Sequence, residues 1–275
     1  MSTPEPPLTG FTVGVTAARR ADELVALLER RGAAVVLGPA MRIMPLADDS
    51  ELHAAIRQVI ASPPEIVVVT TGMGFRGWLD AAQAKGLGEP LLDALRGAAF
   101  FARGPKAAGA VRGAGLREEW SPPSESSGEL LTHLLARGVA GRRIAVQLHG
   151  DPQHDFRDAL AGAGADVSAV PVYRWTPPAD PAPLDTLIDA AAERALDAVT
   201  FTSAPAAAGT LARADTTGHG DALVTALRER VLAMCVGPVT AAPLRERGVP
   251  VVWPERARTA AMVRMLTEEL PARRP

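Results

Sequence analysis

The sequence predicts an α/β protein made of two flavodoxin-like domains, each a doubly wound parallel sheet, that arose by internal duplication. Three observations support this prediction: near-continuous apolar strands, helical stretches between them, and segments that recur at a nearly constant spacing. With 275 residues, of which 47% are hydrophobic, the chain is long enough to bury two ordinary cores.

The recurrence is the strongest of these observations because the matching segments keep almost the same offset along the chain. Residues 32–46 share Gly, Ala, Val, Pro, Arg and Pro in register with residues 164–178, which lie 132 positions later (164 − 32). One match could arise by chance, but a constant offset with so long a period indicates duplication of a domain rather than a solenoid. Residues 68–71 match residues 200–203 at the same offset of 132 (200 − 68). Residues 104–108 match residues 237–241 at an offset of 133 (237 − 104).

Each half of the chain begins with a strand followed by a helix. Residues 11–16 read as a short apolar strand, and the helical stripe over residues 21–28 ends at Gly32, a residue type that suits a helix end. The second half repeats this pattern with a strand over residues 143–148 and a helix from about residue 152 to Gly164.

Apolar runs later in each half, at 66–69 and 199–201, indicate parallel strands covered on both faces. Ligands bind open α/β sheets at the carboxyl ends of such strands, where free helix N–H groups attract anions. The turns that follow the strands and open helices therefore predict a ligand cleft. These turns are Thr70-Thr71-Gly72, Thr202-Ser203, Gly104-Pro105 and Gly237-Pro238.

Composition and charge exclude several classes of function. The formal net charge of −2 gives no basic field of the kind that nucleic-acid binders use, so we expect no nucleic-acid partner. The single cysteine, Cys235, lies in an apolar run and cannot form an internal disulfide, which fits a reducing cytoplasm. The N-terminal residues lack the features of a signal peptide, and no apolar run approaches membrane-spanning length, so we expect a soluble, cytoplasmic protein.

An ordered set of short motifs, spread over residues 10–270, resembles the uroporphyrinogen-III synthase family. Each motif is weak alone, and only the set in this order is specific. The motifs are the opening Val13-Gly14-Val15-Thr16, the Ser-Pro loop before Gly128, Val172-Tyr173, the Thr202-Ser203 turn, and residues 237–241.

The resemblance implies both an arrangement of domains and a reaction. The chain would cross twice between domains, at residues 39–46 and 171–178, which gives one domain from residues 1–40 with 174–275 and another from residues 41–173. The family closes the linear tetrapyrrole hydroxymethylbilane into a macrocycle and inverts its last ring, without metal or organic cofactor. The substrate carries many carboxylates, so helix N-termini and arginines in the cleft between the domains would suit it. We expect a monomer.

The resemblance also implies roles for individual residues. Tyr173, the only tyrosine, falls where the family places a tyrosine that assists loss of the substrate hydroxyl, although packing within the linker is the alternative. Hydroxyls at helix starts would bind substrate or else cap the helices, and for Ser126 and Ser127 we favour capping. The binding candidates are Thr240, Thr202, Ser203, Thr70, Thr71, Gly72, Ser126, Ser127, Arg19, Gly104 and Gly237.

Departures from the family pattern motivate a second hypothesis, a non-catalytic sensor or regulatory module. Ala17-Ala18 stands where many members have Arg-Pro, which leaves Arg19 and Arg20 to compensate, and Ala107 stands where a threonine is expected. The segment 72–78 resembles actinobacterial relatives in which this module precedes a winged-helix DNA-binding domain. In that case a DNA-binding half would follow Pro275.

Two further motifs carry weaker hypotheses. Gly72-x-Gly74-x-x-Gly77 fits the dinucleotide fingerprint, but no acidic residue follows the next strand to bind a ribose, and the glycines could instead allow a close approach of backbone. The polar segment 149–155 could be imagined as a metal site, but such residues in a strand-to-helix loop usually serve as caps, and we assign no metal.

Overall fold

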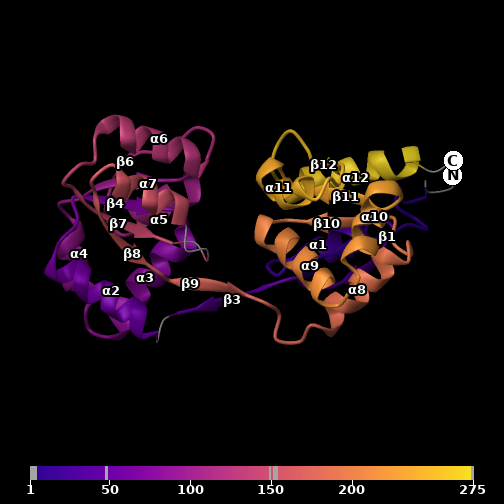
Figure 1. Cartoon of the computed structure of the whole chain (residues 1–275), viewed down its shortest axis with the longest axis horizontal. Coiled ribbons are helices and arrows are strands. Elements are labelled where there is room, and N and C mark those ends of the chain that lie inside the picture. Colours follow the sequence, from indigo (N-terminus) through magenta and orange to yellow (C-terminus); the bar gives the residue numbers. More distant parts are fainter. Residues whose placement is uncertain (1–4, 47–48, 149, 151–153, 274–275) are drawn as a thin grey trace. The chain divides into compact units, whose positions relative to one another are not determined.

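The computed structural model describes residues 5–46, 49–148, 150 and 154–273, and it divides into two compact units. Unit 1 comprises Met1–Arg42 and Thr176–Pro275, and unit 2 comprises Ile43–Trp175 (Figure 1). Unit 2 is thus continuous in sequence, whereas unit 1 joins both ends of the chain. Where the chain passes between the units, β3 (Arg42–Pro45) and β9 (Tyr173–Thr176) form a two-stranded sheet.

Unit 1 contains a five-stranded sheet in the order β12-β11-β10-β1-β2, in which neighbouring strands are parallel. The apolar strand β1 lies between β2 and β10, with Val13 opposite Ala198. The strands are β1 (Thr12–Val15), β2 (Ala34–Leu37), β10 (Ala198–Phe201), β11 (Leu232–Cys235) and β12 (Val251–Val252).

Helices cover both faces of this sheet. Val13 and Val15 of β1 pack with Leu24 and Leu28 of α1 and with the buried residues of α12, while Gly14 between them faces Leu187 of α8 on the other side. The alternation of neighbouring strand residues produces this two-faced core. The helices of unit 1 are α1 (Ala21–Glu29), α8 (Ala182–Ala192), α9 (Ala204–Thr216), α10 (Gly220–Glu229), α11 (Pro238–Glu246) and α12 (Thr259–Arg273).

Unit 2 contains a second five-stranded parallel sheet in the order β6-β5-β4-β7-β8. The central strand β4 is buried along its whole length, as its four consecutive apolar residues predict. The strands are β4 (Ile66–Val69), β5 (Ala99–Ala102), β6 (Glu118–Trp120), β7 (Arg143–Gln147) and β8 (Asp166–Val170).

The two faces of this sheet pack against different helices. Val67 and Val69 face α2, α3, α4 and α5, whereas Ile66 and Val68 face α6 and α7. Each such side chain contributes about 1.5–3 kcal/mol when fully buried. The helices of unit 2 are α2 (Ser50–Ala61), α3 (Gly72–Ala84), α4 (Gly88–Leu95), α5 (Pro105–Gly113), α6 (Ser127–Arg137) and α7 (His154–Gly162).

Corresponding strands of the two chain halves occupy corresponding places in the two sheets. Strand β1 lies beside β10 as β7 lies beside β4, and Val13 and Ile144 face Ala198 and Ile66 respectively. Each sheet therefore takes two strands from one half of the chain and three from the other. The predicted class, two doubly wound parallel sheets joined by two crossing segments, is confirmed, while the duplication remains the evolutionary interpretation of the repeat.

None of the helices in the described ranges is long and apolar enough to span a lipid bilayer.

Candidate functional site

The polar turns of unit 2 lie together at the carboxyl edge of its sheet. Val69 of β4 pairs with Ala102 of β5 and with Gln147 of β7, so the residues that follow these strands emerge side by side. They are Thr70 and Thr71 after β4, and Arg103 and Gly104 after β5. The sequence-predicted residues Thr70, Thr71 and Gly104 are thus brought to one edge.

Gln147 holds this edge together. Its side chain is fully buried, and its Oε1 accepts a hydrogen bond from the Thr71 backbone N–H at 3.1 Å. Thr70 donates its hydroxyl proton to the Gln147 backbone carbonyl at 2.7 Å, and Nε2 of Gln147 donates to the carbonyl of Leu148. The Thr70 proton is therefore used within the fold. Sequence reasoning missed Gln147, although a lone amide at the end of an apolar strand was a signal.

Thr71 connects the edge to Tyr173. Its hydroxyl caps α3 by accepting a hydrogen bond from the backbone N–H of Gly74 at 3.1 Å. The same oxygen lies 3.3 Å from the phenol oxygen of Tyr173, a side chain that is only 6% exposed. Tyr173 also packs in the apolar core of unit 2, so its packing and its polar contact coexist. The structure thus joins the predicted catalytic residue to a predicted binding residue.

The glycines of the Gly72-x-Gly74-x-x-Gly77 motif are explained by packing within the protein. A Cβ on Gly72 would lie 2.1 Å from the carbonyl oxygen of Lys106, and one on Gly74 would lie 2.1 Å from Nε2 of Gln147. Gly77 leaves room for Val172, which a Cβ would meet at 3.0 Å. The start of α3 therefore lies directly against the start of α5, which accounts for these glycines without a dinucleotide.

Two charged residues complete the edge in unit 2. The half-buried Arg103 donates its backbone N–H to Val69 at 2.9 Å. Burial lowers the pKa of its guanidinium from the ordinary value, and the negative charges of Glu125 and of Tyr173 when ionised oppose that shift. Glu125 has a left-handed backbone with φ of 56°, and its carboxylate lies over Gly104, where an added Cβ would meet Oε2 at 3.2 Å.

The serine loop before α6 serves that helix. Ser126 is its N-cap and accepts a hydrogen bond from the backbone N–H of Glu129 at 3.1 Å, as the capping interpretation predicts. Ser127 is the first residue of the helix itself. Gly104 in turn is the N-cap of α5 and provides no side-chain hydrogen bond to that helix.

Unit 1 has an equivalent set of turns at the carboxyl edge of its own sheet. Ser203 caps α9 by accepting from the backbone N–H of Ala206 at 3.3 Å, as Thr71 caps α3. Gly237 caps α11, as Gly104 caps α5. The backbone N–H of Val236 bonds the carbonyl of Phe201 at 2.9 Å, so the Thr202-Ser203 and Gly237 turns are neighbours.

The hydroxyls of Thr240 and Thr202 are not used as caps. Thr240 is 5% exposed and lies within the first turn of α11, where the capping position is taken by Gly237. Among the residues that the structure describes, neither hydroxyl has a hydrogen-bond partner. The capping interpretation of Thr240 is therefore wrong, and its hydroxyl is available to a ligand.

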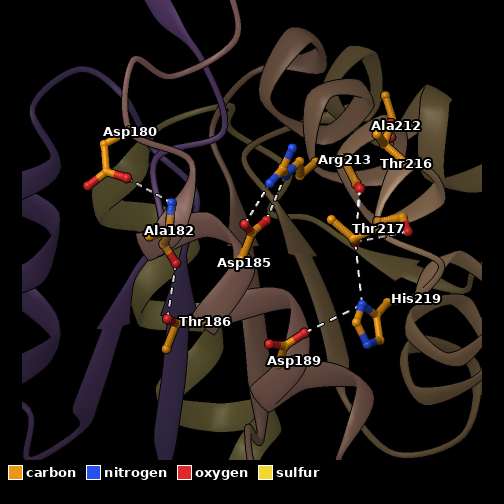
Figure 2. Close-up of polar contacts among 11 residues, drawn as sticks. Asp180, Ala182, Asp185, Thr186, Asp189, Ala212, Arg213, Thr216, Thr217 and His219 are labelled. Atoms are coloured by element: carbon orange, nitrogen blue, oxygen red, sulfur yellow. Dashed lines mark hydrogen bonds and ion pairs between the residues drawn. The ribbon is translucent and has the colours of Figure 1, made fainter.

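Helix α9, whose N-cap is Ser203, makes an ion pair near its C-terminal end. Arg213 donates to Asp185 of α8 through Nε at 2.7 Å and through Nη2 at 2.6 Å (Figure 2). These hydrogen bonds and the positive charge of Arg213 lower the pKa of Asp185, and His219 adds a smaller effect. Figure 2 also shows His219 between Thr217 and Asp189. The pair therefore joins the C-terminal part of α9 to the first turn of α8.

Arg19 and Arg20 have different roles in unit 1. Arg20 is the N-cap residue of α1 and makes a bidentate hydrogen bond to Glu23, so its charge is already paired. Arg19 is exposed and has no charged partner among the described residues. Of the two arginines, Arg19 is therefore the one available to a carboxylate.

The described residues contain no group of three or more His, Cys, Asp or Glu side chains that could hold a metal ion. The predicted polar segment 149–155 includes residues 149 and 151–153, which lie outside the described ranges. Cys235 is fully buried in β11, and burial raises the pKa of its thiol to about 12, so it is a core residue, as predicted, and a poor nucleophile.

The two sheets, with helix-capping turns at the same edge of each, define a two-unit α/β protein of doubly wound type. The family model described as uroporphyrinogen-III synthase HemD matches residues 22–264. The chain therefore belongs to the uroporphyrinogen-III synthase family.

Individual relatives agree with this assignment. A crystal structure of a mutant uroporphyrinogen III synthase from Thermus thermophilus is 30% identical and superposes with a TM-score of 0.79 over 96% of this chain and 100% of that one. The "Uncharacterized protein YjjA" of Bacillus subtilis is 28% identical over 93% of this chain and 94% of its own length. The uroporphyrinogen-III synthetase of Helicobacter pylori, at 12% identity and a TM-score of 0.52, shares the fold.

Proposed function

We propose that this chain is a uroporphyrinogen-III synthase, which cyclises hydroxymethylbilane to uroporphyrinogen III with inversion of the last ring in tetrapyrrole biosynthesis. The observation that carries the proposal is the buried Tyr173 phenol, which lies 3.3 Å from the hydroxyl of Thr71 at the start of α3. Tyr173 falls where the resemblance to the family places a tyrosine that assists loss of the hydroxyl. Membership of the family supports the same reaction.

In the proposed reaction, Tyr173 donates a hydrogen bond or its proton to the terminal hydroxyl of the substrate. The hydroxyl leaves as water, and the resulting azafulvene attacks the far ring to give a spiro intermediate, which fragments and recloses. Thr71 orients the phenol, because its hydroxyl is itself fixed by the Gly74 N–H at 3.1 Å. Most of the selectivity for the inverted product would then come from positioning.

Binding groups for the substrate carboxylates are available in both units. The helices α3, α5, α9 and α11 each follow a strand and begin at the carboxyl edge of its sheet, and a helix N-terminus attracts anions. Arg19 and the hydroxyl of Thr240 add a charge and a hydrogen-bonding group that the described residues do not use. A polycarboxylate substrate fits such a set of donors.

An isomer assay tests the proposal. Purified protein given hydroxymethylbilane should form the type III isomer faster than the spontaneous type I product, and chromatography of the products distinguishes the two. Formation of type I alone would contradict the proposal and favour the regulatory hypothesis, which predicts no catalysis.

Removing the phenolic hydroxyl of Tyr173 should slow turnover by about 10²-fold, the usual contribution of a positioned proton donor. The change is Tyr173→Phe, measured as initial rate of type III formation. Thr132→Val is the matched control, because the hydroxyl of Thr132 bonds only the Gly128 carbonyl of its own helix. If both variants keep the rate of the original protein, Tyr173 has no part in the reaction.

A further inference from the structure

The carboxyl edge of the unit 2 sheet carries a charged pair beside the candidate catalytic tyrosine. The guanidinium of Arg103 interacts electrostatically with both the phenol of Tyr173 and the carboxylate of Glu125. Tyr173 is buried, Arg103 is half-buried and Glu125 is exposed. One cation is therefore near enough to interact with both a buried group that can lose a proton and an anion at the surface.

The backbone places Arg103 at this point. Strands β4 and β5 are parallel neighbours, and the Arg103 N–H bonds the carbonyl of Val69, two residues before Thr71. The hydroxyl of Thr71 in turn lies 3.3 Å from the Tyr173 phenol. Arg103 and Thr71 therefore follow the ends of two adjacent strands and lie close together at the edge of the sheet. This placement depends on the backbone alone.

The backbone also directs Glu125 toward the same place. Its N–H bonds the carbonyl of Pro122 at 3.1 Å, and the next residue, Ser126, caps α6. Between these two fixed points Glu125 adopts a left-handed conformation, which is unfavourable for a residue with a side chain. This conformation brings its carboxylate over Gly104, the residue directly after Arg103.

A cation beside a buried phenol makes that phenol a better proton donor. When Tyr173 gives up its proton, a negative charge remains on its oxygen, and a nearby guanidinium stabilises that charge. The interaction is strong at a partly buried site, because the effective dielectric constant is lower there and salt screens less. Arginine suits this role since its side chain stays protonated in proteins. A carboxylate close to the arginine weakens the effect.

We propose that Arg103 is a positioning residue that sets the acidity of Tyr173, and that Glu125 moderates it. The proposal rests on the proposed function of Tyr173 as proton donor. In the step concerned, the phenol O–H bond breaks and its proton passes to the substrate hydroxyl. The carbon–oxygen bond then breaks with its electron pair leaving on water. The phenolate remains beside Arg103, and the positive charge remains on the substrate ring.

The sequence provides a direct measurement, because Tyr173 is the only tyrosine of the chain. The ultraviolet absorbance of tyrosinate, followed during a pH titration of the intact protein, therefore reports this one phenol. In Arg103→Gln the phenol should titrate at higher pH than in the original protein. In Glu125→Gln it should titrate at lower pH. In Arg103→Lys, which keeps the positive charge, the phenol should titrate at a pH between the values for Arg103→Gln and the original protein.

Arg57→Gln is the matched control for loss of a positive charge. Arg57 is exposed on α2 of the same unit and has no charged partner among the described residues. Its removal should leave the titration of Tyr173 unchanged. Circular dichroism of each variant before titration verifies that the fold is intact. If Arg103→Gln titrates like Arg57→Gln, or if Glu125→Gln shifts in the same direction as Arg103→Gln, the proposal is wrong.

The kinetic result separates this proposal from the function on which it rests. Arg103→Gln should lower kcat by about tenfold with little change in KM, and Arg103→Lys should restore part of the loss. A raised KM with an unchanged titration would assign Arg103 to substrate binding and overturn the proposal. If the original protein makes no type III isomer, the proposed function fails, while the titration still decides the coupling of Arg103 to Tyr173.

Discussion

The hydroxyl of Thr71 lies 3.3 Å from the phenol of Tyr173 and at the same time accepts a hydrogen bond from the backbone N–H of Gly74. One oxygen therefore both starts helix α3 and fixes the only tyrosine of the chain. Ser203, the corresponding residue of unit 1, caps α9 in the same way. This pair of caps allows the two roles of Thr71 to be measured separately.

Thr71→Ala should reduce the free energy of unfolding by about 1 kcal/mol, the usual effect of losing a helix cap. Ser203→Ala removes the equivalent cap of α9 and should cost a similar amount in chemical denaturation. Only Thr71→Ala removes a hydroxyl that contacts the Tyr173 phenol, so of these two variants only Thr71→Ala should change the tyrosinate titration. Equal titration curves for the two variants would show that the contact between Thr71 and Tyr173 has no influence on the phenol.

Gly72→Ala should destabilise the protein by about 1–3 kcal/mol, the typical cost of overpacking. The reason is that its Cβ would lie 2.1 Å from the Lys106 carbonyl oxygen, so α3 and α5 would have to move apart. Gly109→Ala, in the middle of α5, is the control. Nothing lies within 4 Å of the added methyl there, and alanine favours the helix by about 0.5–1 kcal/mol. Denaturation midpoints that rank the two variants in the opposite order would contradict the close approach of α3 to α5.

The ion pair between Arg213 and Asp185 should make the free energy of unfolding depend on pH at acid pH. The hydrogen bonds from Arg213 lower the pKa of Asp185 below its ordinary value of 3.8. A carboxyl with a lowered folded-state pKa contributes stability that is fully present above the ordinary value and is lost as the pH falls toward the folded-state value.

Thermal unfolding measured at neutral and acid pH tests this expectation with Arg213→Gln. Its Tm should be lower than that of the original protein at pH 7, and the difference should shrink as the pH falls below 3.8. Added salt should reduce the difference at pH 7, since the two side chains are 31% and 30% exposed. Arg57→Gln again controls for charge, and an equal loss of Tm in both variants at pH 7 would rule out a specific pair.

Cys235 should resist alkylation in the folded protein. Burial raises the pKa of its thiol to about 12, and the side chain is fully inaccessible. Iodoacetamide at pH 8 should therefore label the thiol only after denaturant is added, as mass spectrometry can show. Rapid labelling of the native protein would mean that strand β11 opens and exposes Cys235 to solvent.

The fold could be predicted from the sequence because its signals are local and occur twice. Apolar runs such as residues 66–69 fix buried strands, and the matched turns fix where the helices begin. Thr71 and Ser203, and likewise Gly104 and Gly237, prove to be the first capping residues of corresponding helices. The same matches could not distinguish the roles of Thr70 and Thr71. Neighbouring side chains point in opposite directions, so Thr70 is buried against Gln147 while Thr71 contacts Tyr173.

The polar network of unit 2 could be predicted only in part. Tyr173 stood out because it is the single tyrosine at a family position, but Gln147, Arg103 and Glu125 come from separate segments. Their meeting depends on which strands are neighbours and on the conformation of one loop residue, Glu125. Thr240, for which the sequence left both capping and ligand binding open, shows the converse case. Gly237 occupies the cap position of α11, and the Thr240 hydroxyl has no partner among the described residues.

The exchange of strands between chain halves has a consequence for synthesis on the ribosome. Strand β1 pairs with β10, and the hydroxyl of Thr16 bonds the carbonyl of Thr200, a residue 184 positions later. At about 5–20 residues per second, the first strand and helix of a nascent chain would wait roughly 10–40 s for their partners. Unit 2, continuous in sequence, can complete its core during that interval. The first 42 residues must therefore remain unaggregated while a whole domain folds behind them.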